Sequence, residues 1–273
     1  MLITVVVPTL NRSEIVRSCL NDLENFWDKI TEVILINQSE DFPIVDYSIR
    51  RKILVREIAL STPSASMARN IGLLESKSDI VIFIDDDVRI KNIAFIENHL
   101  RHYKDPQVPG VYGQVLEVGQ SPTECPDPTE IETDWGWMRL PANYGRPCRT
   151  RNGGSGNLSV RRDWALAVGG MDAWFERGAR REETEFNLRL TARYGPLVFD
   201  PEASLVHLSA GGGSRSWGRV VRTVPMHHIV GHWYFWLAAF RDGTLGRRGL
   251  LMELRHIGVA LLRNPKTGWN VPA

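Results

Sequence analysis

Residues 80–87 read Ile80-Val-Ile-Phe-Ile-Asp-Asp-Asp87, and this stretch decides the fold class. Five consecutive apolar residues, most of them β-branched, are typical of a strand that is covered on both faces at the centre of a parallel sheet. Three carboxylates follow directly, at the end of the strand where open α/β sheets bind their ligands. The stretch therefore predicts a central strand with an acidic ligand site at its carboxyl end.

The segments around this strand alternate between strand and helix patterns. Five short apolar segments predict strands: 2–7, 32–37, 52–58, 197–200 and 203–207. Four segments with helical spacing predict helices: 13–27, 64–74, 164–170 and 183–193. The first half has the order strand, helix, strand, strand, helix, strand. That order predicts an α/β fold with a mixed, mostly parallel sheet flanked by helices.

The last part of the chain differs in charge from the rest. The whole chain of 273 residues has a net charge of +1. Residues 215–273, however, hold eight Arg and one Lys against one Asp and one Glu, a net charge of +7. Two helical patterns rich in Trp, Leu and Arg lie in this segment and predict a helical C-terminal extension. Two interpretations stay open: helices that close the core or a dimer, and a basic anchor on a membrane surface.

The three acidic residues Asp85, Asp86 and Asp87 repel one another and need a counter-charge. A divalent cation supplies it, and carboxylate oxygens suit Mg²⁺ or Mn²⁺. His207 is a further candidate ligand, because imidazole suits Mn²⁺. The plain alternatives are a solvated acidic turn and a structural histidine.

Three glutamates, Glu182, Glu183 and Glu185, enter a predicted helix. Acidic residues in a first helical turn are favoured by the helix dipole, which is the plain explanation. Three of them exceed what a cap needs, so one could act as a general base. The glycine-rich segment Gly153–Ser159 allows close approach to a ligand, or forms an ordinary turn before a strand.

Taken in chain order, these motifs resemble the family-2 inverting glycosyltransferases of the GT-A fold. The resemblance runs from about Ile3 to His207. Its motifs are Val5–Arg12, Val33–Asp41, Ser66–Gly72, Asp85–Asp87, Gly153–Ser159, Gly169–Asp172, Glu182–Leu190 and His207.

The resemblance implies a role for each matched residue. The nucleotide and donor would be bound by Pro8, Thr9, Leu10, Asn11, Arg12, Asn37, Arg69, Asp85 and Asp86. The metal, Mn²⁺ or Mg²⁺, would be held by Asp87 with Asp85 and His207. Glu183 would be the catalytic base, with Glu182 and Glu185 as rivals. The donor sugar and the acceptor would meet Gly154, Asn157 and Trp135. Asn37 departs from the family pattern, which usually has Asp there to contact the base.

The resemblance also implies an activity and a division of the chain. A hexosyl or deoxyhexosyl group would pass from a nucleotide-diphosphate sugar to a saccharide or lipid-linked acceptor, in surface polysaccharide or glycolipid synthesis at the cell envelope. Residues 1–214 would form the catalytic domain, with a nucleotide-binding half (1–103) and an acceptor half (104–214), and 215–273 the extension. No nucleic-acid partner is expected.

Other sequence features concern location and the competing functions. Three cysteines without metal-type spacing and an N-terminus without a signal-peptide pattern predict a cytoplasmic protein. If the basic tail is a membrane anchor, it would lie on the inner face of the membrane. Two alternatives stay open: a catalytically silent binding module of the same fold, and a sugar nucleotidyltransferase.

Overall fold

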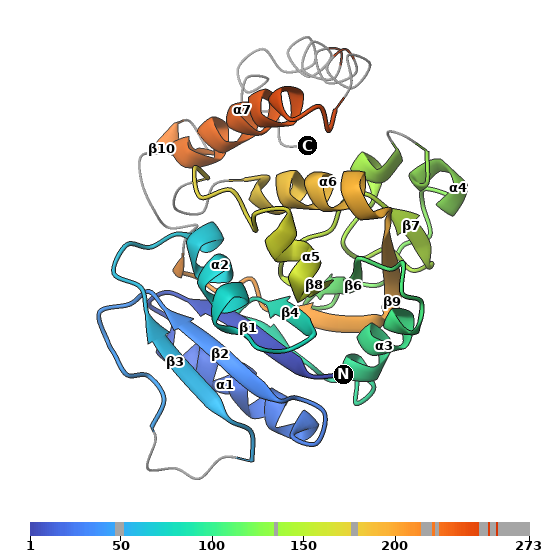
Figure 1. Cartoon of the computed structure of the whole chain (residues 1–273). Helices are drawn as coiled ribbons and strands as arrows, with labels where there is room; N and C mark the ends of the chain where they lie inside the picture. The colour runs from blue at the N-terminus through green and yellow to red at the C-terminus, as the bar shows by residue number, and fades with distance from the viewer. Residues whose placement is uncertain are drawn as a thin grey trace.

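The computed structural model describes residues 1–46, 52–133, 136–175, 180–213, 220–221, 224–245, 251 and 255. A large sheet of nine strands runs through the middle of this part of the chain. Helices cover both of its faces (Figure 1). The mixed, mostly parallel α/β sheet predicted from the sequence is confirmed.

The first half of the chain forms the parallel part of the sheet. Its elements are β1 (Ile3–Thr9), α1 (Ser13–Leu23), the 3₁₀ turn η1 (Glu24–Phe26), β2 (Glu32–Asn37), β3 (Val55–Ala59), α2 (Ala65–Glu75) and β4 (Ile80–Ile84). β1 lies between β2 and β4, and all three run in the same direction. The predicted order of strands and helices is therefore correct, and β2 has the predicted bounds.

The second half adds the antiparallel pairs. Its elements are β5 (Val88–Arg89), α3 (Phe95–Leu100), η2 (Arg101–Lys104), β6 (Gly110–Glu117), α4 (Pro128–Ile131), η3 (Gly136–Arg139), β7 (Cys148–Thr150), β8 (Asn157–Arg161), α5 (Arg162–Ala167), α6 (Glu182–Tyr194) and β9 (Leu197–His207). The strand order of the sheet is β3-β2-β1-β4-β8-β6-β9-β5, with β7 paired to β9. β8 runs antiparallel to β4 and β6, whereas β6 and β9 are parallel. The two strands expected at 197–207 are one strand, β9, whose pairing with β6 shifts register between Gly113 and Val115.

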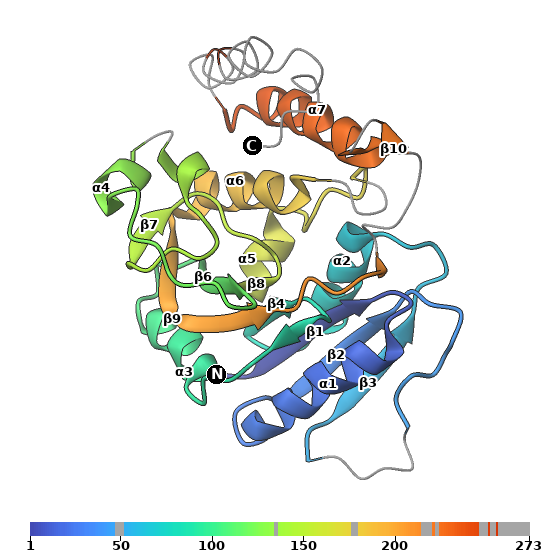
Figure 2. The ribbon, with the colours of Figure 1, turned by 180° about the vertical axis from the view of Figure 1, so that it is seen from behind.

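The strand at 80–84 is buried on both faces, as its apolar run predicts. Ile80, Ile82 and Ile84 pack into one core with α1 and α3. Val81 and Phe83 point the other way, into a core that α2, α5 and α6 complete. Figure 2, seen from behind, shows α1 and α3 on the face opposite α2. The two cores fix the carboxyl end of β4, and with it the position of the acidic triplet.

In the C-terminal extension, the short strands β10 (Val220–Val221) and β11 (Val224–Pro225) precede the helix α7 (Met226–Arg241). It packs on α6, where Phe235 and Trp236 join a third apolar cluster with Leu188 of α6. The helix therefore closes a core, which is one of the two interpretations left open by the sequence. The second helix predicted in the extension, near 250–261, lies outside the described residues, apart from positions 251 and 255, which are helical.

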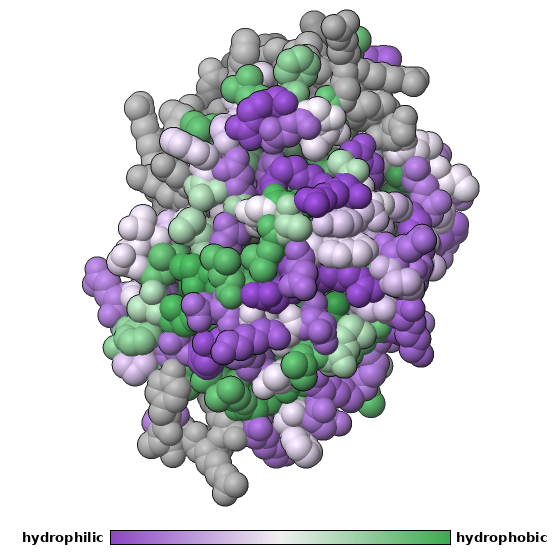
Figure 3. All heavy atoms as spheres, viewed as in Figure 1, coloured by the Kyte–Doolittle hydropathy of each residue, from purple (hydrophilic) through white to green (hydrophobic). Residues whose placement is uncertain are grey.

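The same helix also carries apolar side chains toward solvent. Its exposed apolar residues are Val230, Trp233, Leu237 and Phe240. Figure 3 shows apolar surface in the region of α7, interspersed with polar side chains. Among the described residues, no helix is long and apolar enough to span a bilayer.

Candidate active site

A cavity of about 680 Å³ opens at the carboxyl ends of β1 and β4. Several residues singled out in the sequence line it: Pro8, Thr9, Leu10, Arg12, Arg69, Asp85, Asp86, Asp87, Gly154, Glu182, Glu183 and His207. They come from segments far apart in the chain. Because parallel strands end at one edge of the sheet, the fold gathers these segments around one hollow.

Asp86 is held by two side chains from the end of β1 and the residues after it. It is buried, accepts a hydrogen bond of 2.7 Å from the hydroxyl of Thr9, and pairs with Arg12 at 2.8 Å. Burial raises the pKa of Asp86 to about 6, although Arg12 and Thr9 act in the opposite direction. Its carboxylate therefore serves the packing of β1 against the triplet.

Asp85 and Asp87 turn toward His207, which comes from the end of β9. One ligand atom of each residue lies within 4.8 Å of the other two. The Nε2 atom of His207 is 3.2 Å from Oδ1 of Asp87. The hydrogen bond and charge of Asp87 raise the pKa of His207 to about 9, whereas burial opposes them. Burial would raise the pKa of Asp87, but His207 and Arg12 lower it overall.

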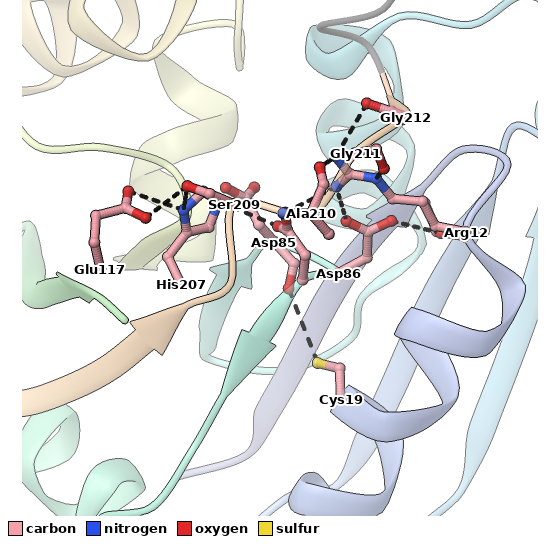
Figure 4. Close-up of polar contacts among 12 residues, drawn as sticks. Arg12, Cys19, Asp85, Asp86, Glu117, His207, Ser209, Ala210, Gly211 and Gly212 are labelled. Carbon is pink, nitrogen blue, oxygen red and sulfur yellow. Dashed lines mark hydrogen bonds and ion pairs between the residues drawn. The ribbon is translucent and has the colours of Figure 1, made fainter. Parts of the chain in front are cut away.

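The chemistry of this donor set fits a divalent cation. Two carboxylates and one imidazole converge, and Mn²⁺ accepts both ligand types. The other ring nitrogen of His207, Nδ1, lies 3.1 Å from Oε1 of Glu117, and Ser209 donates to the same carboxylate (Figure 4). A carboxylate behind a histidine ligand fixes its ring and raises its basicity. Asp85, Asp87 and His207 could therefore hold a metal.

Arg69 connects the two acidic regions of the cavity. Its Nη2 atom donates to Oδ1 of Asp85 at 2.8 Å, and its Nη1 atom lies 3.8 Å from Oε1 of Glu182. The side chain is 7% exposed, and its Nε and Nη1 atoms are buried without a hydrogen-bond partner among the described residues. Arg69 also lines the cavity, so its positive charge lies beside any anionic ligand there.

Glu182 and Glu183 begin α6 and line the cavity together. Burial, the charge of Glu183 and a hydrogen bond with it raise the pKa of Glu182 well above its ordinary value. Glu183 is half-buried, so its carboxylate is the more accessible of the two. The two neighbouring carboxyl groups thus differ in burial, and the Glu183 carboxylate is the one that a ligand in the cavity can approach.

Glu185, the third glutamate, has a structural partner. It is 2% exposed and forms a two-pronged ion pair with Arg189, one turn further along α6. Arg189 in turn donates to the carbonyl of Gly170 at 2.8 Å. Unlike Glu182 and Glu183, Glu185 does not line the cavity.

Asn37 lies at the end of β2 but does not line the cavity. It is 1% exposed, its amide group donates to Glu57 and to the carbonyl of Asp41, and its oxygen accepts from the backbone of Ser39. A contact between the Asn37 side chain and the nucleotide, which the family resemblance implies, would therefore have to break this network. The neighbouring Gln38 lines the cavity instead.

Two further residues that the family resemblance places in the site, Asn11 and Asn157, do not line the cavity. Asn11 is exposed, has a φ of 52°, and donates its backbone N–H to Ser39 outside the cavity wall. Asn157 is fully buried beneath the cavity, where its amide meets His99 and the carbonyls of Gln114 and Ala203. The side chain of Asn157 therefore does not face the cavity in this geometry, because strand β8 turns it inward. Trp135 lies outside the described residues.

The family of the chain follows from comparison with known sequences. Residues 4–165 match the model of glycosyl transferase family 2, more than half of the chain. The chain belongs to glycosyl transferase family 2. No curated protein shows a significant match to the sequence.

Solved structures show the same GT-A fold as this glycosyltransferase. S. aureus TarS 1–349 in complex with UDP-GlcNAc has a TM-score of 0.64 at 14% identity, covering 87% of this chain and 66% of that one. GalNAc-T7 with UDP, GalNAc and Mn²⁺ has a TM-score of 0.61 at 15% identity, and the match covers 86% of this chain and 48% of that one. The mannosyltransferase PcManGT from Pyrobaculum calidifontis, in complex with GDP-Man and Mn²⁺, has a TM-score of 0.55 at 15% identity, and the match covers 98% of this chain and 82% of that one. The chain thus spans less than two thirds of the first two proteins.

Some cavity residues of the glycosyltransferase were not anticipated from its sequence. They are Gln38, Tyr112, Glu117, Arg180 and His228. Glu117 faces His207 because β6 pairs with β9 in that register, and no local pattern reveals such a pairing. His228 reaches the cavity from α7, so the extension contributes to the wall.

Proposed function

We propose that this protein is a metal-dependent, inverting glycosyltransferase that uses a nucleotide-diphosphate sugar. The observation that carries the proposal is the convergence of Asp85, Asp87 and His207 in the same cavity as Glu183. A cation site and an accessible carboxylate are the two elements that such a transfer needs. The transferred group is proposed to be hexosyl or deoxyhexosyl.

Glu183 is proposed as the general base. It would take the proton of the acceptor hydroxyl as the oxygen attacks the anomeric carbon from the face opposite the diphosphate. A single displacement of this kind inverts the anomeric centre. Glu182, with its raised pKa, would stay protonated beside it and donate a hydrogen bond to Glu183. This bond would orient the base toward the cavity.

Asp85, Asp87 and His207 are proposed to hold Mn²⁺ or Mg²⁺, and Asp85–Asp87 would serve as the family's acidic DxD element. A cation there would offset the charge of the departing diphosphate. Arg69, which lines the same cavity, would add its positive charge beside the phosphates. Pro8, Thr9 and Leu10, with Gln38, would border the nucleoside on the other side of the cavity.

The acceptor is proposed to be a saccharide or lipid-linked saccharide of the cell envelope, at the inner face of the cytoplasmic membrane. Two observations support it. Residues 215–273 carry a net charge of +7, and α7 exposes Trp233, Leu237 and Phe240. Basic helices with exposed aromatic and aliphatic side chains bind anionic lipid surfaces. His228 of the same helix lines the cavity, which would bring a membrane-borne acceptor close to Glu183.

A donor screen tests the function. UDP, GDP and dTDP sugars are incubated with the protein and Mn²⁺, and release of nucleoside diphosphate is measured with and without an acceptor extract. The proposal expects release from one donor class that EDTA abolishes. A folded protein that binds a nucleotide but releases none supports a silent binding module. Release of a sugar phosphate with formation of nucleoside triphosphate from added pyrophosphate supports a nucleotidyltransferase.

A further inference from the structure

Arg12 lies just after β1 and is surrounded by oxygen atoms. Its Nη1 atom is 2.8 Å from Oδ1 of Asp86 and 3.1 Å from Oδ2 of Asp87. Its other nitrogens donate to three successive carbonyls, those of Ala210, Gly211 and Gly212, at 2.7, 3.3 and 3.1 Å. A guanidinium has five N–H groups, and here each has an oxygen to meet. Figure 4 shows the side chain held between the triplet and this segment.

The segment that Arg12 holds is the continuation of the strand that carries His207. Beyond His207, the backbone N–H of Leu208 donates to the carbonyl of Asp87, and that of Ala210 donates to Oδ2 of Asp87. The same Oδ2 atom faces Arg12, which leaves Oδ1 directed at Nε2 of His207. One guanidinium therefore fixes both the carboxylate rotamer of Asp87 and the chain that follows His207.

We infer that Arg12 is a positioning residue for the metal site, acting through Asp87 and through residues 208–212. This inference rests on the proposed metal-dependent function. Partners behind a ligand usually change metal affinity by about 10- to 100-fold when they are removed. Arg12 thus has a role different from the direct donor contact that the family resemblance implies for it. Lysine cannot replace it, because an ammonium offers three donors and no planar fork.

Gly213 and Gly212 offer a test that leaves every charge in place. Both have left-handed backbones, with φ of 64° and 82°. A Cβ on Gly213 would lie 2.8 Å from Cζ of Arg12, and so would push the guanidinium away from the segment. A Cβ on Gly212 would lie no closer than 3.9 Å to the same side chain. The two alanine variants therefore impose similar backbone strain and differ in their contact with Arg12.

The experiment measures Mn²⁺ binding to the full chain, without any nucleotide, by electron paramagnetic resonance. We expect Arg12→Lys and Gly213→Ala to raise the Kd for Mn²⁺ by about 10-fold or more. Gly212→Ala should raise it less than Gly213→Ala. Gly243→Ala, with a φ of 67° and open space around the added Cβ, should leave it within twofold. Circular dichroism verifies that each variant is folded.

A second measurement separates this inference from the proposed function. Amide hydrogen exchange of residues 208–212, taken without metal, should become faster in Arg12→Lys than in the wild type, and should not change in β1. The inference is overturned if Arg12→Lys and Gly213→Ala both bind Mn²⁺ with a Kd within twofold of the wild type. If the wild type binds no Mn²⁺, the proposed metal-dependent function is wrong. In that case the exchange experiment still tests the inference: unchanged exchange of residues 208–212 in Arg12→Lys would show that Arg12 does not fix this segment.

Discussion

The Nε2 atom of His207 lies 3.2 Å from Oδ1 of Asp87, although the two residues come from opposite halves of the chain. β5, which directly follows the acidic triplet, pairs antiparallel with β9, and Val88 is opposite His207 in that register. The contact is therefore set by strand pairing and not by a mobile loop. Any cation bound between them would tie the two halves of the glycosyltransferase together.

Replacement of Glu183 should affect chemistry more than binding. Glu183→Gln keeps the size of the side chain and removes its basicity, so kcat should fall by about 10²- to 10⁴-fold with little change in the KM for the donor. Steady-state assays with the matching donor measure both constants. Glu14→Gln, on an exposed glutamate of α1 that is 82% accessible, is the matched control and should keep wild-type kcat. A Glu183→Gln enzyme with full kcat would remove Glu183 as the base.

Restoring aspartate at position 37 should destabilise the protein. Asn37→Asp would set a carboxylate against Glu57, whose Oε1 atom now accepts from the Asn37 amide at 2.8 Å. Loss of that buried hydrogen bond should lower the free energy of unfolding by about 1–3 kcal/mol. Urea denaturation measures it, with Asn25→Asp on the surface as control. A stable Asn37→Asp variant with tighter binding of a uridine nucleotide would show that the position reads the base after all.

A buried histidine should make the fold sensitive to mild acid. His99 is fully buried between Ser159 and Asn157, and burial lowers its pKa from 6.5 to about 4. The unfolded chain therefore takes up a proton between these values while the folded protein does not. The free energy of unfolding should fall with decreasing pH, by about 3 kcal/mol from this group between pH 7 and pH 4. His99→Gln should weaken that pH dependence in urea titrations; an unaltered slope would contradict the assignment.

Much of this architecture follows from local sequence. The apolar run at 80–84 and the strand at 32–37 lie where they were predicted, because a doubly covered strand needs apolar residues on both faces. Local sequence does not predict the features that depend on pairing between distant segments. Glu117 supports His207 only through the β6–β9 register, and Asn157 points into the core because of the side on which β8 presents it. The engagement of Asn37 with Glu57 is likewise a contact between neighbouring strands.

The two sides of α7 should respond differently to substitution. Phe235 is fully buried against α6, so Phe235→Ala should lower the free energy of unfolding by about 3 kcal/mol or more. Leu237→Ser and Phe240→Ser change side chains that are 70% and 58% exposed, and should leave stability within about 0.5 kcal/mol. The double variant should float less with anionic vesicles than the wild type. Equal flotation of both, or none by the wild type, would contradict the membrane contact.

The most direct test of the proposed site is nucleotide binding with and without metal. Thermal shift is measured against UDP, GDP, dTDP and CDP in the presence of Mn²⁺ or EDTA, since a ligand of the folded state raises the Tm. We predict a rise with one nucleotide that requires Mn²⁺, is lost in Asp87→Asn and persists in Asp163→Asn, whose side chain is 88% exposed on α5. The same rise in EDTA, or in Asp87→Asn, would contradict a metal-dependent donor site at Asp85, Asp87 and His207.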